Sequence, residues 1–310
     1  MSQEPFHTPV LVDSVSTYLI NDRSGIYVDG TLGGGGHSLA ILKKLTTRGR
    51  LIGIDWDEQA IQKAQEHLRQ EASRVSIRKG NFNQITGILA AVDIKKVDGI
   101  LLDLGVSSFQ IDTSERGFSY LTSGPLDMRA SQETKLSAEE VVNDYPEHEL
   151  ARIFKQYGEE NKARSIAQAI VRERQRKRIA TTQELVKIIE SRLPFGQRIK
   201  SLARIFQAIR IEVNKELENL QSFLDQSLDV LKPGGRLVII AYHSLEDRLV
   251  KNFFYYQSHP CECPPELPVC GCGKKPALRV LIRKVVRPSA EEMKANPRSR
   301  SAKLRAAEKI

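Results

Sequence analysis

Short apolar runs that end on polar residues alternate with helical patterns over the first third of the chain. Strand-like runs lie at residues 26–29, 50–57, 75–82 and 97–104, and helix-like periodicity separates them, as in residues 58–70. This alternation predicts an α/β fold with a parallel sheet. The run at 97–104 is nearly all apolar, which predicts a strand buried on both faces.

The strand rhythm stops at residue 113 and does not return before about residue 214. Helical periodicity is found at residues 139–157, 161–178, 182–193 and 200–220. Ser137 with Glu140 predicts a capping box, and Thr182 is a further candidate cap. Strand patterns resume at 236–242, after a predicted LKPGG turn, and at 277–286. We therefore predict a discontinuous α/β domain, residues 1–112 and 215–310, and an all-helical insertion, residues 113–214.

A glycine-rich loop follows the first predicted strand. The strand ends on Asp29, the four glycines Gly33 to Gly36 come next, and a helical pattern begins there. Strand, glycine loop and helix is the arrangement that opens a nucleotide pocket in doubly wound α/β domains. Glycine lets the backbone turn tightly and lets a ligand approach without meeting a Cβ. The alternative is a glycine turn that binds nothing.

The spacing between this loop and the next acid favours a ligand that contains adenosine. Asp55 ends the second strand 19 positions after Gly36, close to the roughly 20 expected for an acid on ribose hydroxyls. NAD and S-adenosylmethionine both fit this spacing. The loop is not G-x-G-x-x-G, because Ser38 stands at its sixth position. Asp29 would repel a pyrophosphate and attract a sulfonium, so the methyl donor is favoured.

Polar residues also end the later predicted strands, where ligands bind in open parallel sheets. Asn81 and Phe82 follow the third strand, and Asp103 ends the fourth. Phe82 is a candidate to stack on adenine, or else a core residue. His37 and Gln110 are candidates for directional hydrogen bonds to a ligand, and His37 has helix capping as its alternative role.

A formal charge of +9 and a pI near 9.3 suit a polyanionic partner, with solubility as the competing explanation. Residues 162–178 include seven Lys or Arg and one Glu. Residues 283–309 include nine Lys or Arg and three Glu. Such clusters neutralise phosphates, unless they are solvated helix faces. We expect residues 298–305 to form a tail that orders only on RNA. The candidate RNA-binding residues are Arg172, Arg174, Arg176, Lys177, Arg178, Arg298, Arg300, Lys303 and Arg305.

All four cysteines lie in one short stretch with the spacing C-x-C-x₆-C-x-C. They are Cys261, Cys263, Cys270 and Cys272. Four thiolates could enclose a tetrahedral Zn²⁺, although the usual spacing is C-x₂₋₄-C. Reduced thiols in a proline-rich loop, or redox chemistry, are the alternatives. The N-terminus, MSQEPFHTPV, lacks a signal-peptide pattern and no apolar run approaches a membrane span, so we expect a cytoplasmic protein.

The chain resembles the bacterial 16S rRNA (cytosine-N4) methyltransferase H family, also called MraW-like proteins. The matching segments span almost the whole chain and several are long and unusual. They are His7-TPVL, DGTLGGGGHS from Asp29, GIDWDEQA from Gly53, GNF from Gly80, DLGVSSFQID from Asp103, RGFSY from Arg116, GPLDMR from Gly124, FQAIRIEVNKEL from Phe206, LKPGGRLVIIAYHSLEDRLVK from Leu231 and NPRSRSAKLRAAE from Asn296.

The resemblance implies a Rossmann-like S-adenosylmethionine methyltransferase sheet with an inserted helical domain. It implies methyl transfer to the exocyclic N4 of a cytidine in the decoding region of small-subunit rRNA, with the small ribosomal subunit as a partner. The family's donor-binding positions match here as Gly35, Gly36, His37, Asp55, Phe82, Asp103 and Gln110. Asp29 joins them on the argument from spacing.

The residue that accepts the amine proton stays open at this stage. Many amino-methyltransferases carry Asp/Asn-Pro-Pro-aromatic at the fourth strand end, but this chain has Asp103-Leu-Gly-Val. Asp103 is the first catalytic candidate, with pure donor binding as its alternative. His243 is the second, with a loop hydrogen bond as its alternative. An NAD-dependent oxidoreductase, a non-catalytic RNA-binding assembly factor and a DNA amino-methyltransferase are the competing functions.

Overall fold

The computed structural model describes residues 9–105, 108–264 and 271–310. The chain divides into two compact units, one formed by Met1–Gly105 with Glu218–Ile310 and the other by Val106–Leu217. The sequence placed the corresponding boundaries at residues 112/113 and 214/215. Each unit has a hydrophobic core of its own.

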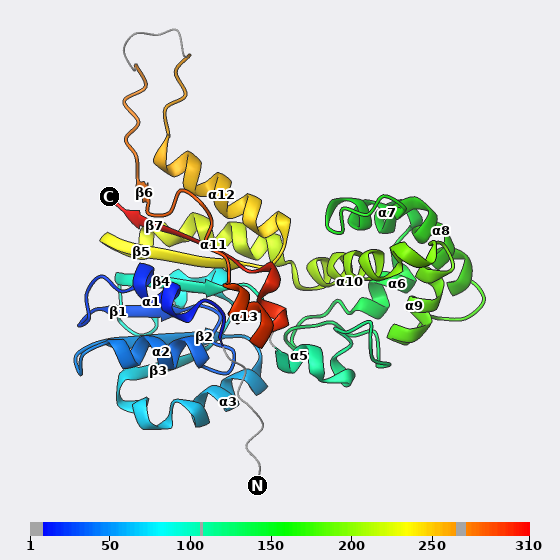
Figure 1. Cartoon of the computed structure of the whole chain (residues 1–310), viewed down its shortest axis with the longest axis horizontal. Coiled ribbons are helices and arrows are strands. Elements are labelled where there is room, and N and C mark those ends of the chain that lie inside the picture. Colours follow the sequence, from blue (N-terminus) through cyan, green and yellow to red (C-terminus); the bar gives the residue numbers. More distant parts are fainter. Residues whose placement is uncertain (1–8, 106–107, 265–270) are drawn as a thin grey trace. The chain divides into compact units, whose positions relative to one another are not determined.

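The first unit contains a seven-stranded sheet in the order β3-β2-β1-β4-β5-β7-β6 (Figure 1). Strands β1 to β5 run parallel, as the sequence predicts, and β7 lies antiparallel between β5 and β6. The strands are β1 (Ile26–Asp29), β2 (Arg50–Asp55), β3 (Val75–Lys79), β4 (Val97–Asp103), β5 (Leu231–Ala241), β6 (Leu278–Val280) and β7 (Lys303–Lys309).

Helices cover both faces of this sheet (Figure 1). Along β4, Ile100 and Leu102 pack into one core and Leu101 into the other, and all three are fully buried. The strand is therefore buried on both faces, as its apolar run predicts. The helical elements of this unit are α1 (Val12–Leu19), α2 (Gly36–Lys44), α3 (Glu58–His67), η1 (Arg69–Arg74), η2 (Phe82–Gln84), α4 (Ile85–Ala90), most of α11 (Glu216–Val230), α12 (Ser244–Ser258), α13 (Ala290–Ala295) and η5 (Pro297–Ser301).

Two sequence predictions about the later strands are wrong. The predicted LKPGG turn is part of β5, which accommodates it through a register shift opposite Val97 and Gly99 and a positive φ of 76° at Gly234. The strand expected at 277–286 is only Leu278–Val280, which pairs with β7, and Val286 further along makes an isolated bridge to Leu304.

The expectation of a C-terminal tail that orders only on RNA is also wrong. Residues 303–309 form β7, which pairs with β5 over six residues from Arg236↔Glu308 to Ala241↔Lys303. Leu304, Ala306 and Ala307 are fully buried. The small side chains let this strand pack inside the sheet, and because few of its residues are large and apolar, the sequence pattern did not predict a strand here.

The second unit is helical. Its elements are α5 (Ser108–Asp112), η3 (Ser114–Arg116), α6 (Ala138–Asp144), α7 (Glu147–Gln156), α8 (Ala163–Arg174), α9 (Thr182–Glu190), η4 (Phe195–Gln197) and α10 (Arg198–Asn214). The pattern at 139–157 is two helices because Pro146 precedes α7 and has no N–H to continue the ladder. The pattern at 200–220 is split by Lys215, which has a positive φ of 52°.

Side-chain caps fix where two of these helices begin. Ser137 and Glu140 form the predicted capping box at α6. The cap of α9 is Thr181 rather than Thr182, and Thr181 forms a second capping box with Glu184. Thr182 instead donates its hydroxyl proton to the carbonyl of Thr122 at 2.7 Å. Across the described part of the chain, no helix is long and apolar enough to cross a membrane.

Candidate active site

The start of the glycine loop after β1 is held by both neighbouring strands. Gly30 donates its N–H to the carbonyl of Leu101 on β4, and Leu32 donates to Ile54 on β2, each at 2.9 Å. Gly33 and Gly35 have positive φ values of 50° and 79°, which side chains rarely adopt. The loop is thus a fixed backbone surface at the carboxyl end of the sheet.

Asp29 is an internal anchor of this loop. Its side chain is 1% exposed, accepts a hydrogen bond from the Ser38 hydroxyl at 2.7 Å and accepts one from the Thr31 N–H at 3.3 Å. Burial raises the pKa of Asp29, and Ser38 partly opposes this shift. Asp29 was predicted to contact the ligand, and in this structure it shapes the glycine loop.

Asp55 links the loop to the end of β2. One carboxylate oxygen accepts the Gly33 N–H at 2.8 Å and the other accepts the Asp57 N–H at 2.9 Å. Burial raises the pKa of Asp55 to about 6 despite these two donors. Each oxygen keeps a second lone pair, so the carboxylate can still accept hydrogen bonds from the hydroxyl groups of a diol.

His37 and Asp103 face each other between α2 and the end of β4. His37 Nε2 lies 3.5 Å from Asp103 Oδ2, and the His37 side chain is 7% exposed. Burial disfavours the charged imidazole, but the nearby carboxylate of Asp103 outweighs it and raises the pKa of His37. Both ring nitrogens of His37 and the Oδ1 atom of Asp103 are buried and have no hydrogen-bond partner. Buried polar atoms of this kind are normally satisfied, so a polar ligand is expected here.

Sequence reasoning missed two neighbours of Asp103. Thr31 accepts the Asp103 N–H on its hydroxyl oxygen at 2.6 Å, which fixes the end of β4 against the glycine loop. Tyr242, at the end of β5, has its pKa raised by burial and by Asp103. Tyr242 could have been found as the residue that directly follows the last apolar position of β5.

His243 caps a helix. Its Nδ1 accepts the Glu246 N–H at 3.4 Å, and the Glu246 carboxylate accepts the N–H groups of Tyr242 and His243 at 2.9 and 3.3 Å. His243 Nε2 also lies 3.1 Å from the Glu246 carboxylate. The alternative that the sequence left open, a loop hydrogen bond, is thus present, and a catalytic role for His243 stays a prediction.

The aromatic and amide candidates lie in different units. Phe82 is half-buried beside the end of β3, and its ring packs edge-on against Phe223 with centroids 5.8 Å apart. Gln110 lies on α5 in the helical unit and is 7% exposed. Donor binding by either residue stays a prediction.

The chemistry of this sheet edge fits a cationic nucleoside. Asp29, Asp55 and Asp103 lie close enough together that their negative charges shift the pKa of one another or of a neighbouring residue. This edge of the sheet would therefore repel a pyrophosphate. Asp103 Oδ1 offers an unpaired acceptor, and Asp55 offers acceptors for a ribose diol. S-adenosylmethionine has the ammonium, sulfonium and diol groups that such acceptors would bind.

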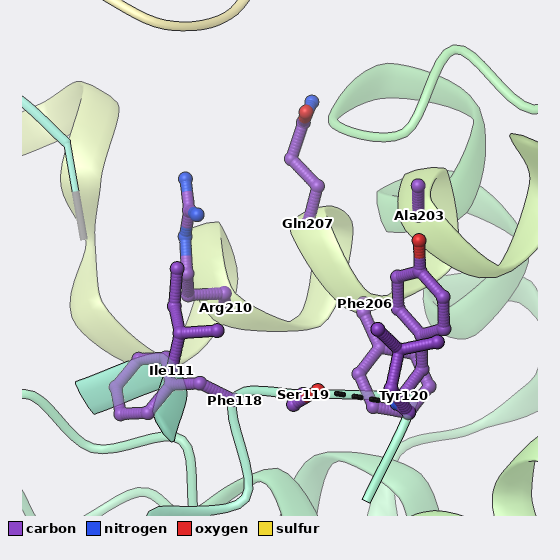
Figure 2. A pocket seen from close by; sticks show the side chains of 9 residues that line it. Ile111, Phe118, Ser119, Tyr120, Ala203, Phe206, Gln207 and Arg210 are labelled. Carbon is purple, nitrogen blue, oxygen red and sulfur yellow. Dashed lines mark hydrogen bonds between the residues drawn. The ribbon is translucent and has the colours of Figure 1, made fainter. Parts of the chain in front are cut away.

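A separate pocket of about 270 Å³ lies within the helical unit (Figure 2). Tyr120 and Phe206 form one wall, with ring centroids 5.7 Å apart in an edge-on arrangement. Gln207 and Arg210 supply polar groups from α10, and Arg210 pairs with Glu216 at 2.7 Å. Aromatic walls with a few polar groups suit a flat, polar ring.

Most of the predicted RNA-binding cations take part in ion pairs. Arg176 pairs with Glu173, Lys177 with Glu184, Arg178 with Glu139 and Asp144, and Lys303 and Arg305 with Asp247. The Arg174 guanidinium donates to the Val142 carbonyl at 2.8 Å, and burial lowers its pKa. Exposed pairs are weak and can exchange for phosphate, so Arg176, Lys177 and Arg178 stay candidates. Arg172 is largely exposed, while Arg298 and Arg300 lie on η5.

Three of the four predicted metal ligands come together. The thiol sulfurs of Cys261, Cys263 and Cys272 all lie within 4.8 Å of one another. None of the three is in a disulfide. Cys270 lies outside the described residues.

Comparison with known proteins identifies the family. The sequence model of the MraW methylase family matches residues 4–310. A relative named "Ribosomal RNA small subunit methyltransferase H" from Heliobacterium mobile is 48% identical over 308 residues, which cover 98% of this chain and 99% of that protein. A protein of the same name from Clostridium botulinum strain Loch Maree is 50% identical over 306 residues, with coverages of 98% and 99%.

Solved structures are more distant. A SAM-dependent O-methyltransferase from Thermotoga maritima matches with a TM-score of 0.43 and 11% identity, covering 100% of this chain and 68% of that one. Fibrillarin from Aeropyrum pernix, bound to S-adenosyl-L-methionine, matches with a TM-score of 0.38 and 8% identity over 92% and 67% of the two chains. The fold is Rossmann-like, and on the full-length family match the chain belongs to the MraW methylase family of S-adenosylmethionine-dependent methyltransferases.

Proposed function

We propose that the chain methylates the exocyclic N4 of a cytidine in the decoding region of small-subunit rRNA. The observation that carries this proposal is the unpaired, buried Asp103 Oδ1 at the end of β4, beside His37 and the glycine loop. The relatives' name, which specifies small-subunit ribosomal RNA, supports the choice of substrate. The natural setting is the cytoplasm, with the small ribosomal subunit as partner.

The donor is held by residues of the first unit. Asp55 accepts from the ribose hydroxyls. The backbone of Gly35 and Gly36 supports the ligand, and a Cβ on either residue would press on Leu68 or Pro9, 3.2 Å away. His37 and Phe82 complete this set, and Gln110 of the helical unit stays a further candidate, as the family resemblance implies. When bound, S-adenosylmethionine supplies a methyl group on a positively charged sulfur that an amine can displace in line.

Cytosine N4 is a poor nucleophile because its lone pair is delocalised into the ring. An acceptor on the amino hydrogens localises that lone pair and stabilises the positive charge that develops on nitrogen. Asp103 is our candidate for this role, since one of its oxygens is near His37 and the other has no partner. His243 is kept as a second candidate to take up the proton.

The helical unit is assigned to substrate recognition. Its pocket combines the rings of Tyr120 and Phe206 with the polar groups of Gln207 and Arg210, and a base could stack and hydrogen-bond there. Arg176, Lys177 and Arg178 lie on the same unit and would neutralise phosphates. A base in a structured ribosomal particle must also be turned out to reach a methyl donor.

The test is to incubate the full chain with tritiated donor and small subunits that lack the modification, then map the labelled base by mass spectrometry. The expected label is one methyl group on N4 of a cytidine in the decoding region. A label on another base, or on ring carbon, would overturn the N4 proposal. Transfer to duplex DNA with no transfer to subunits would replace the rRNA substrate.

A further inference from the structure

A paired extension leaves the sheet between α12 and β6, and no hydrophobic core holds it together. Residues 259–264 and 271–277, here called the arm, run as two extended segments away from the first unit (Figure 1). Every residue in these two segments is exposed or half-buried. At the base, Ala277 donates its N–H to the Gln257 carbonyl at 2.9 Å.

The three described cysteines lie across the two segments of the arm. Cys261 and Cys263 belong to the outgoing segment and Cys272 to the returning one, yet their sulfurs are all within 4.8 Å of one another. Cys263 is half-buried and Cys261 is exposed. Thiols gathered in this way on a segment without a core require an explanation other than apolar packing.

We propose that Cys261, Cys263 and Cys272 bind a structural Zn²⁺ that fixes the arm. Tetrahedral zinc with Zn–S bonds of about 2.3 Å needs sulfurs about 3.8 Å apart, so shifts of about 1 Å or less would complete the geometry. The three thiols lose their protons on binding, and the free energy of binding adds to the stability of the arm.

Other features of the arm support a metal cluster. Gly273 follows Cys272 with a positive φ of 64°, which turns the chain directly behind a ligand. Lys274 pairs with Glu262 at 2.6 Å, so an ion pair also joins the two segments beside the thiols. Lys274 and Lys275 would balance the negative charge of zinc bound by thiolates.

Sulfur-only ligand sets select zinc, copper(I) or iron–sulfur clusters, and of these zinc has no redox chemistry and accepts a tetrahedral site. The fourth position is left to water or another ligand, and the proposal does not depend on Cys270. The arm lies apart from the donor residues along the chain, so the proposal stands or falls independently of the methyltransferase function.

The experiment measures metal in the full chain after expression with zinc and removal of loosely bound ions. Wild type should hold about one zinc per chain, and the Cys261→Ser/Cys263→Ser variant should hold less than a tenth of that. Glu262→Gln, which changes the residue between the two cysteines and keeps every thiol, should bind as wild type does. Cobalt should replace zinc and give a thiolate charge-transfer band in the near ultraviolet, absent in the double variant.

A second readout detects the arm itself. Chelation should speed tryptic cleavage after Lys274 at least tenfold, and added zinc should restore protection. Wild-type protein without zinc or cobalt binding, or with metal that persists in the double variant, would overturn the proposal. So would a metal-free protein whose four cysteines prove to be disulfide-bonded. Copper or iron in place of zinc would overturn the choice of metal.

Discussion

Asp103 and His37 form a buried pair in which each side chain keeps an unsatisfied atom. His37 Nδ1 and Asp103 Oδ1 both lack partners, although the two residues lie within 3.5 Å through their other atoms. An unsatisfied buried acceptor costs roughly 1–3 kcal/mol. Because the folded protein bears this free-energy cost, we expect a ligand to relieve it by forming hydrogen bonds with these atoms.

We predict that Asp103→Asn separates donor binding from chemistry. The amide keeps the shape of the side chain but loses the charge that stabilises a developing ammonium, so kcat should fall by about 10²-fold or more. The Kd for S-adenosylhomocysteine should change by less than about fivefold. Single-turnover methylation and calorimetry measure the two effects. Full activity removes Asp103 from the mechanism, and a loss of activity that tracks Kd assigns it to donor binding.

We predict that donor affinity falls in acid because Asp55 becomes protonated. Burial raises its pKa to about 6, so the carboxylate that accepts ribose hydroxyls is present above pH 7 and is lost as the pH falls through 6. Affinity should approach a tenfold loss per pH unit below that value. Calorimetry with S-adenosylhomocysteine between pH 5 and 8 measures this.

Asp55→Asn is the matched control for this pH dependence. It should bind more weakly at pH 8 and show a flat profile around pH 6. Any slope that remains in the variant reports His37, whose pKa is also raised. An unchanged wild-type slope in the variant would contradict the assignment to Asp55.

The sequence predicted which acids end the strands but not what each one does. Asp29, Asp55 and Asp103 follow from the strand periodicity alone. The hydrogen bond from Ser38 that makes Asp29 an anchor, and the Thr31 hydroxyl that meets Asp103, depend on how the loop folds back. The spacing of residues along the sequence does not reveal such contacts, so the roles of these acids could not be predicted.

At the scale of elements, β7 differs most from expectation. Its sequence, KLRAAEK, combines four charged residues with Leu304 and two alanines, and it was predicted to be part of a basic tail. In the structure the small residues fill the sheet, and Lys303 and Arg305 reach Asp247 on α12 at 3.2 and 2.7 Å. The helix breaks at Pro146 and Lys215 were not predicted either, because the helical periodicity of the sequence continues through both positions.

We predict that deleting residues 303–310 prevents stable folding of the first unit. The deletion exposes β5 along its length and removes the buried Leu304, at a cost of several kcal/mol out of the roughly 5–15 typical of a domain. Circular dichroism on heating should show no cooperative transition for this unit. Ile310→Ser is the control, because that side chain is 64% exposed and should be tolerated. A truncated chain that melts like wild type would contradict the role of β7.

At the scale of the whole molecule, the charge of +9 is distributed over both units and much of it is paired. Net charge therefore supports a polyanionic partner without showing where it binds. The parallel order of β1 to β5 and the helical insertion could be predicted because long, regular patterns specify them. How the inserted unit meets a substrate could not, since no sequence spacing encodes it.

We predict that Arg176→Gln/Lys177→Gln/Arg178→Gln lowers the salt dependence of rRNA binding. Each lost phosphate contact should reduce the slope of log K against log[salt] by about 0.7–0.9, while donor affinity stays unchanged. Filter binding on rRNA over a salt series measures the slope. Lys43→Gln/Lys44→Gln, two exposed residues of α2, is the control and should keep the wild-type slope. An unchanged slope in the triple variant would show that these cations serve only their local ion pairs.

The position of β7 also has a consequence for how the protein is made. The strand formed by Lys303–Lys309 lies between β5 and β6, and it is the last strand of this sheet to be synthesised. A growing chain cannot place that strand until residues 303–309 have left the exit tunnel. Until then, β6 lacks its partner strand and one edge of β5 stays unpaired, so the sheet is completed only late in synthesis.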